Sequence, residues 1–263
     1  MSTSELPAMK SSPKFIFFTD FDGTITLQDS NDFMTDNIGY GQEKRKQGNK
    51  DTLTGAVTFR ESFKGMMESV TRPYKECIQY LVDNIKLDPF FDEFLKYALA
   101  NNIPVVVLTS GMEPIVEALL EALVGAENAS KIQVVGNNVK AKDGRDMMND
   151  EDGWELTFHD DSDFGHDKSL TLRPYAQLPE DKRPTMFYAG DGVSDLSAAR
   201  ETDLLFAKKG HDLVSYCVKE EIPFTLFETW ESILGKVKEI VAGETTVKEA
   251  AEEGVKQFKA GNA

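Results

Sequence analysis

Two carboxylates stand two positions apart near the start of the chain, where residues 20–24 read Asp-Phe-Asp-Gly-Thr. They follow residues 15–18, an apolar run that is too short for a helix and typical of a buried strand. Two acids held this close repel each other, so such a pair is stable mainly around a cation or with one acid protonated. The pattern therefore predicts a metal-assisted site in which one acid attacks and the other moves a proton. An ordinary acidic turn is the alternative, because Asp and Gly are common turn residues.

An anion-binding turn is predicted after residues 105–108, another apolar run. Ser110 and Gly111 come directly after that run and before a helical pattern. A hydroxyl and bare amides at a strand-to-helix turn suit an anion, and the positive end of the helix adds to the attraction. An ordinary helix cap explains the same two residues, so this pair alone does not decide.

A metal-binding loop is predicted after residues 186–189, a further buried strand. Asp191 stands at the strand end between two glycines, and Asp195 follows in the first turn of a helix. Mg²⁺ prefers carboxylate oxygens and takes one or two of them directly; acidic helix caps are the alternative. Lys168 is the one cation that we expect at the site, where it would keep an acid ionised. A lone Lys without context is usually solvated surface.

Taken in order, the four segments resemble the four motifs of the haloacid dehalogenase-like phosphohydrolases. The resemblance implies a phosphatase that forms an aspartyl phosphate. It makes Asp20 the nucleophile, and Asp22 the general acid that protonates the leaving oxygen and then activates water. It makes Ser110, the Gly111 amide and Lys168 the groups that bind the substrate phosphate.

The same resemblance implies a Mg²⁺ cofactor. The ion would be held by the Asp20 carboxylate, the backbone carbonyl of Asp22 and Asp191, while Asp195 would coordinate through water or orient its neighbours. Phosphoryl transfer needs in-line positioning and neutralisation of negative charge, which a metal, a Lys and amides supply. Asp at the second acidic position, rather than a small apolar residue, favours phosphatase over dehalogenase chemistry.

A helical insertion after the first motif is similar to the cap of the phosphoserine phosphatase-like branch of this family. The closer resemblance is to a subgroup of bacterial 2-hydroxy-3-keto-5-methylthiopentenyl-1-phosphate phosphatases and related fungal polyol phosphatases. Met66 stands where phosphoserine phosphatases carry an arginine for the substrate carboxylate, and Arg60 lies nearby in the sequence. Phosphoserine is therefore disfavoured. Residues 28–32 are candidates for reading substrate hydroxyls, although a helix cap with solvent-facing side chains explains them equally well.

The chain is predicted to be an α/β protein with a parallel-sheet, Rossmann-like core. Apolar runs alternate with helical patterns from residue 90 onward, as in a sheet with helices on both faces. Residues 1–14 read as a loose leader, and 137–164 as a hairpin-like flap. The predicted parts are the catalytic core at 13–28 and 90–243, an inserted helical cap domain at 29–89, and a C-terminal helix or tail at 244–263 that docks, pairs with a second chain or frays.

Composition and charge exclude several classes of partner. The 263 residues include 29 Lys plus Arg and 45 Asp plus Glu, and the net charge of −16 argues against nucleic acids and anionic membranes. No secretory signal is visible, and no apolar run is long enough to span a bilayer. Cys77 and Cys217 have neither metal nor disulfide spacing, so a cytoplasmic location is expected.

The predicted function is Mg²⁺-dependent hydrolysis of a small phosphorylated metabolite, a polyol or sugar phosphate first, by a monomer or homodimer. There are three alternatives: a phosphatase of methionine-salvage or amino-acid-type phosphates, a phosphomutase, and a non-catalytic regulator that binds a phosphate ligand. The regulator is disfavoured, since every reactive position holds a competent residue. The motifs predict the type of reaction but not the substrate, because contacts between the substrate and side chains of the cap determine which substrate binds.

Overall fold

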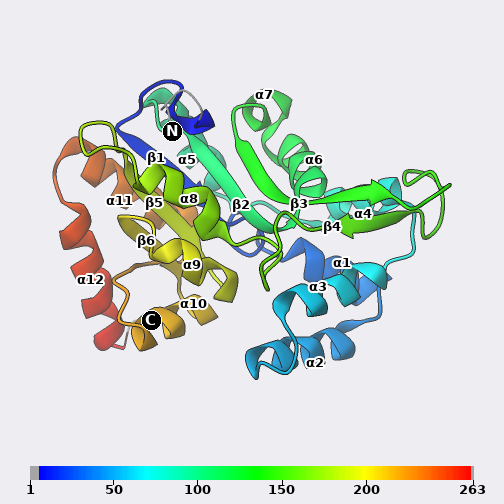
Figure 1. Ribbon diagram of the computed structural model, residues 1–263. Coiled ribbons are helices and arrows are strands. Elements are labelled where there is room, and N and C mark those ends of the chain that lie inside the picture. Colours follow the sequence, from blue (N-terminus) through cyan, green and yellow to red (C-terminus); the bar gives the residue numbers. More distant parts are fainter. Residues whose placement is uncertain (1–5, 262–263) are drawn as a thin grey trace.

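The computed structural model describes residues 6–261 and contains one seven-stranded sheet (Figure 1). The strand order is β4-β3-β2-β1-β5-β6-β7, and all neighbours run parallel except β3 and β4. The strands are β1 (Phe15–Thr19), β2 (Val105–Met112), β3 (Gln133–Ala141), β4 (Trp154–Thr157), β5 (Thr185–Gly190), β6 (Leu204–Lys208) and β7 (Thr225–Phe227). The predicted α/β fold class is therefore confirmed.

The central strand β1 is covered on both faces, which explains its continuous apolar run. Phe17 packs on one face against Phe94 and Trp230, with ring centroids 4.7 and 5.5 Å away. Phe18 packs on the other face against Tyr175, at 5.3 Å. The helices that follow or precede these strands are α5 (Phe91–Ala100), α6 (Glu113–Val124), α7 (Ala126–Ala129), α8 (Lys168–Ala176), α9 (Leu196–Ala199), α10 (Asp212–Lys219), α11 (Trp230–Ala242) and α12 (Val247–Lys259).

Four helices occupy the segment predicted as a cap, and Figure 1 shows α1–α3 as a group beside the sheet. Their bounds are α1 (Ser30–Ile38), α2 (Gln42–Leu53), α3 (Phe59–Glu68) and α4 (Tyr74–Asn84). The helix α3 begins with a capping box between Thr58 and Glu61 and buries Phe63, Met66 and Met67. Its apolar stripe therefore packs as core. The exact limits of the core and the cap in the sequence stay a prediction.

The predicted flap joins the core to the cap. Its antiparallel pair, β3 with β4, forms one edge of the sheet (Figure 1), and hydrogen bonds link this pair and its connecting loop to the start of α4. The Tyr74 amide donates to the Met147 carbonyl at 2.9 Å, and the Trp154 indole N–H donates to the Arg72 carbonyl at 3.0 Å. These bonds tie one end of the cap to an extension of the sheet.

Both ends of the described chain pack on the sheet layer. Leu6, Ala8 and Met9 are buried, so the prediction of a loose leader is wrong for this part, while residues 1–5 lie outside the described range. The helix α12 docks rather than frays: a Cβ on Gly254 would lie 2.0 Å from the Phe224 carbonyl oxygen. That close approach places α12 along β7. Residues 262–263 of the predicted tail are not described.

Within residues 6–261, no helix combines the length and the apolar character needed to cross a bilayer.

Candidate active site

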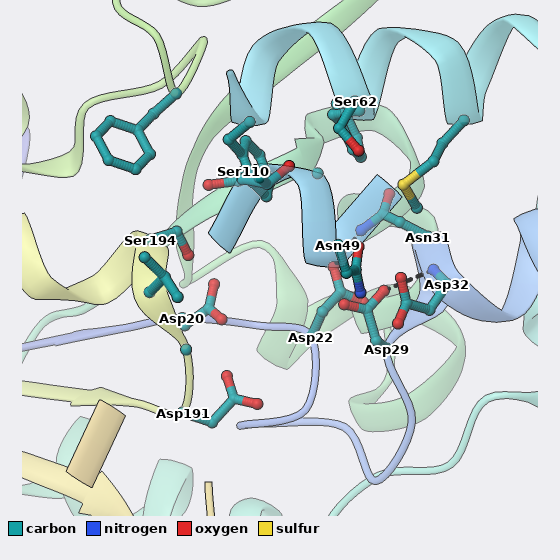
Figure 2. A pocket seen from close by; sticks show the side chains of 18 of the residues that line it. Asp20, Asp22, Asp29, Asn31, Asp32, Asn49, Ser62, Ser110, Asp191 and Ser194 are labelled. Atoms are coloured by element: carbon teal, nitrogen blue, oxygen red, sulfur yellow. Dashed lines mark hydrogen bonds between the residues drawn. The ribbon is translucent and has the colours of Figure 1, made fainter. Parts of the chain in front are cut away.

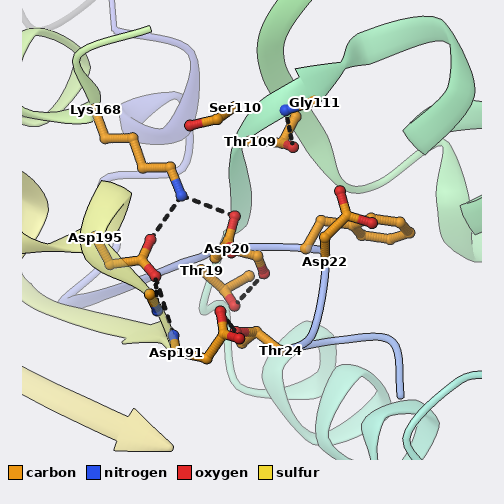
Figure 3. Close-up of polar contacts among 12 residues, drawn as sticks. Thr19, Asp20, Asp22, Thr24, Thr109, Ser110, Gly111, Lys168, Asp191 and Asp195 are labelled. Atoms are coloured by element: carbon orange, nitrogen blue, oxygen red, sulfur yellow. Dashed lines mark hydrogen bonds and ion pairs between the residues drawn. The ribbon is translucent and has the colours of Figure 1, made fainter. Parts of the chain in front are cut away.

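The predicted segments meet at the carboxyl edge of the parallel strands (Figure 3). Asp20 follows β1, Ser110 lies near the end of β2, and Asp191 follows β5. Because β1 pairs directly with both β2 and β5, these three strand ends are neighbours. Lys168 reaches the same place from the first position of α8. The structure therefore brings together residues that are far apart in the sequence.

Lys168 lies between two carboxylates in the interior. Its Nζ donates to Asp20 Oδ1 at 2.8 Å and to Asp195 Oδ1 at 2.6 Å, and its side chain is 0% exposed. Burial alone would lower the pKa of Lys168, but the Asp195 and Asp20 carboxylates outweigh burial and raise it. Lys168 thus stays charged beside the predicted nucleophile.

Asp20 carries more negative charge around it than one Lys neutralises. Burial raises the pKa of Asp20 well above its usual value, Lys168 opposes this, and Asp195 and Asp191 add to it. One oxygen each from Asp20, Asp191 and Asp195 lie within 4.8 Å of one another. Hard carboxylate oxygens at this spacing fit a divalent ion such as Mg²⁺.

Asp195 is fully engaged by the protein. Its Oδ1 also accepts the Tyr188 hydroxyl at 2.5 Å, and its Oδ2 accepts the backbone amides of Asp191 and Gly192, both at 3.0 Å. With both oxygens occupied, Asp195 is placed to orient its neighbours. The sequence analysis missed Tyr188, although a tyrosine inside a buried strand signals a hydroxyl that needs a partner.

Asp22 points toward the cap. Its Oδ1 accepts the Ser30 amide at 2.7 Å, and its Oδ2 accepts the Asn31 side-chain amide at 2.8 Å. Burial, followed by the charge of Asp29, raises the pKa of Asp22 to about 7. A carboxyl group that titrates near neutrality suits general acid–base work.

The turn after Asp22 depends on a glycine. Gly23 has φ +73°, and a Cβ there would lie 2.6 Å from Asp191 Oδ2. Glycine adopts this conformation without strain and leaves room for the approach of Asp191. A larger residue at this position would be strained and would displace the Asp191 carboxylate.

Ser110 presents an unused hydroxyl. Its Oγ is buried and has no hydrogen-bond partner within the described residues, while its carbonyl accepts the Asn137 side chain at 2.7 Å. A buried orphan hydroxyl beside Asp20 fits a site that awaits a ligand. The Gly111 amide, also predicted to bind phosphate, donates to Thr109 Oγ1 at 2.8 Å in this structure.

A pocket of about 300 Å³ opens over these residues (Figure 2). We call the residues contributed by the core the core wall: Asp20, Asp22, Thr109, Ser110, Gly111, Phe164, Asp191, Gly192, Val193, Ser194 and Asp212. The cap wall consists of Asp29, Asn31, Asp32, Asn49, Thr52, Leu53, Phe59, Ser62, Phe63 and Met66. The lining includes both polar and apolar side chains, and none of the lining residues is Lys, Arg or His.

The two arginines nearest in sequence to the cap wall are used elsewhere. Arg45 forms ion pairs with Asp32 at 2.5 Å and with Asp36 at 2.6 Å. Arg60 donates to the Asp160 carbonyl at 2.6 Å and does not line the pocket, whereas Met66 does. Neither arginine therefore offers a free guanidinium to a substrate carboxylate in this pocket.

Comparison with known proteins identifies the family. A model described as haloacid dehalogenase-like hydrolase matches residues 17–200. The chain belongs to the haloacid dehalogenase-like hydrolases, as the four motifs predicted. Together with the named phosphatases that it is similar to, this makes it a phosphoric monoester hydrolase.

Two fungal relatives cover nearly the whole chain. The chain is 52% identical over 217 residues to Pdp3-interacting factor 1 of Schizosaccharomyces pombe, covering 82% of this chain and 91% of the relative. It is 46% identical over 245 residues to Polyol phosphate phosphatase PYP1 of Saccharomyces cerevisiae, covering 91% and 99%. Among solved structures, a phospho-aspartyl intermediate analogue of phosphoserine phosphatase matches with a TM-score of 0.58 at 17% identity, covering 88% of this chain and 98% of that one. This last match supports the fold alone.

Proposed function

We propose that this chain hydrolyses the phosphate ester of a small polyol, with Mg²⁺, through an aspartyl phosphate on Asp20. The observation that carries the proposal is the acidic cluster at the sheet edge, where Asp20 lies near Asp191 and Asp195 and bonds to the buried Lys168. The name of the Saccharomyces cerevisiae relative supports the substrate class.

The core residues divide the reaction between them. The Asp20 carboxylate attacks phosphorus and the ester oxygen leaves. Lys168 and the free hydroxyl of Ser110 neutralise charge on the phosphate oxygens. Asp22, whose pKa is raised to about 7, gives its proton to the leaving alkoxide. Asp22 then takes a proton from water as that water displaces phosphate from Asp20.

Mg²⁺ fits the acidic group at the sheet edge. The carboxylates of Asp20 and Asp191 and the backbone carbonyl of Asp22 would hold the ion, and Asp195 would orient Asp191 through its backbone amide. Bound there, the ion supplies positive charge against the phosphate. The raised pKa of Asp20 supports this need for a cation.

The cap wall favours a neutral substrate body. It offers carboxylates, amides and hydroxyls together with the apolar side chains of Phe59, Phe63 and Met66, and no cationic group. Hydroxyls both donate and accept hydrogen bonds, so they suit this mixture. A polyol chain also has C–H faces for the apolar residues.

The test is release of inorganic phosphate from a substrate panel by the purified chain. Glycerol 3-phosphate and sorbitol 6-phosphate represent polyols, glucose 6-phosphate represents sugars, and p-nitrophenyl phosphate serves as a generic ester. We expect Mg²⁺-dependent release that EDTA abolishes, with the polyol esters preferred. Turnover that survives EDTA contradicts the metal assignment. A preference for glucose 6-phosphate or phosphoserine contradicts the substrate class.

A further inference from the structure

The cap wall holds acids that the reaction does not use. Asp29 caps the start of α1, where its Oδ1 accepts the Asp32 amide at 2.8 Å. Asp32 follows one turn later, and both side chains line the pocket (Figure 2). Asp32 forms an ion pair with Arg45 at 2.5 Å, and the carboxylates of Asp29 and Asp32 would repel a further anion beside them.

Arg45 fixes Asp32 in place. The guanidinium donates from Nη1 to Asp32 Oδ2 at 2.5 Å, while its Nε and Nη2 bind Asp36 at 2.6 and 2.9 Å. Within residues 6–261, Asp32 Oδ1 accepts no hydrogen bond. The side chain of Asp32 is 32% exposed, and Asp32 lines the pocket.

The helix that carries Arg45 also contributes polar side chains to the pocket. Asn49 lies one helical turn after Arg45 on α2 and therefore shares its face. Asn49 and Thr52 line the pocket from α2. At the core side, the buried Ser110 Oγ has no partner, which independently points to a ligand that enters between the two walls.

We propose that Asp32, held by Arg45, is the specificity-determining residue of this site: its free oxygen accepts a hydrogen bond from a terminal hydroxyl of the substrate and turns away phosphate esters with a second anionic group. The inference rests on the proposed function and names the residue that selects the substrate. The guanidinium is shared between two carboxylates, so it does not act as a binding site for a substrate anion.

Two substrates test this directly, because they differ only at one carbon. Glycerol 3-phosphate carries a terminal hydroxyl where 3-phosphoglycerate carries a carboxylate. The variant Asp32→Asn keeps the shape and removes the charge. Asp36→Asn is the matched control, since it removes the other carboxylate on Arg45 and does not line the pocket. The readout is kcat/KM for both esters, with p-nitrophenyl phosphate and phosphoethanolamine as further arms.

We expect the wild-type chain to prefer glycerol 3-phosphate, and Asp32→Asn to shift the preference toward 3-phosphoglycerate by about tenfold or more. The change should appear mainly in KM, because Asp32 lies away from the reacting atoms. Hydrolysis of p-nitrophenyl phosphate should stay within about threefold, and Asp36→Asn should keep the wild-type preference.

An unchanged preference in Asp32→Asn, or an equal shift in Asp36→Asn, overturns the inference. The wild-type chain could instead prefer phosphoethanolamine, and Asp32→Asn could remove that preference. Asp32 would then bind the substrate's ammonium group, and this outcome also overturns the inference. Failure of the wild-type chain to hydrolyse p-nitrophenyl phosphate with Mg²⁺ overturns the proposed function itself, and this inference with it.

Discussion

Behind the core wall of the pocket, the Lys168 side chain is wholly buried and bonded to two carboxylates, whereas on the cap wall Asp32 is 32% exposed and keeps one oxygen free. The core groups stand at the ends of paired strands, and the cap groups stand on helices joined by short turns. Strand ends are fixed by hydrogen bonds to both neighbours. Under the proposed function, the reaction is built into the rigid wall and substrate choice into the adaptable one.

Replacement of Asp20 by Asn should have the largest effect, because it removes the attacking oxygen while preserving shape. We expect kcat for p-nitrophenyl phosphate to fall on the order of 10⁴-fold, with the thermal midpoint unchanged or raised as repulsion is relieved. Asp212→Asn is the control, since Asp212 also lines the core wall but is exposed. A residual rate within tenfold of wild type would assign the nucleophile elsewhere.

Replacement of Lys168 by Met should test how strongly the core wall depends on its one buried cation. It leaves Asp20 and Asp195 without their shared partner, which should cost about 3–5 kcal/mol of unfolding free energy. The matched control is Lys209→Met, whose ion pair with Glu228 is largely exposed and should contribute no more than about 1 kcal/mol. Urea unfolding measures both.

Added Mg²⁺ refines that experiment. If the acids bind the ion, Mg²⁺ should restore part of the stability of Lys168→Met, because a ligand that binds only the folded state stabilises it. Equal losses in the two lysine variants would show that the core wall does not depend on the buried pair.

The core wall was predictable from the sequence because its residues follow apolar runs. A run of four or five apolar residues predicts a buried strand, and parallel strands bring their carboxyl ends to one edge. Asp20, Ser110 and Asp191 could therefore be placed together before any coordinates. The strand β7 was missed because three residues give no usable pattern, and α8 was missed because Pro174 lies inside it.

The cap wall was not predictable in the same way. Residues 28–32 were named as candidates, yet a helical pattern does not say which side chain faces the core domain. Asn49 and Ser62 were not considered, because their role depends on how α2 and α3 lie over the sheet edge. The pairing of Arg45 with Asp32 crosses two helices and has no signature in local spacing.

The pH dependence of stability should include a contribution from His166. His166 is buried and holds the Thr109 carbonyl at 2.7 Å through Nδ1, and burial lowers the pKa of His166 from 6.5 to about 4. Between pH values of about 6.5 and about 4, His166 is therefore protonated in the unfolded chain and neutral in the folded chain. The contribution of His166 to the free energy of unfolding should therefore fall by up to about 3 kcal/mol as pH drops from about 6.5 to about 4, whereas the raised pKa of Asp22 contributes with the opposite sign.

Urea unfolding across that pH window measures this contribution. His166→Asn lacks this contribution, so its stability should fall less steeply toward acid than that of the wild type. A profile that is equally steep in His166→Asn would mean that the acid loss arises from other groups.

The smallest effect on activity is expected from a substitution at Arg60, which connects the cap to the core. Arg60 on α3 donates to the carbonyls of Asp160 and Ser162 at 2.6 and 3.2 Å, and its guanidinium stacks 4.1 Å from the Phe158 ring centre. The loop that Arg60 contacts is bonded to the start of α8, where Asp160 Oδ2 accepts the Asp167 amide at 2.8 Å. Arg60 thus joins the cap to the segment that presents Lys168.

Arg60→Gln should weaken this contact without unfolding the core wall or the cap wall. The side-chain bonds are partly exposed, and the backbone bond from the Arg60 amide to the Asp163 carbonyl, at 2.8 Å, remains. We expect kcat/KM for glycerol 3-phosphate to fall by about five- to tenfold, with a stability loss near 1 kcal/mol. Lys64→Gln on the same helix is the control, because Lys64 is exposed and its ion pair is with Glu68 on the same helix. A loss as large as that of Asp20→Asn would mean that the rigid wall takes its geometry from the cap, and the division between reaction and selection would not hold.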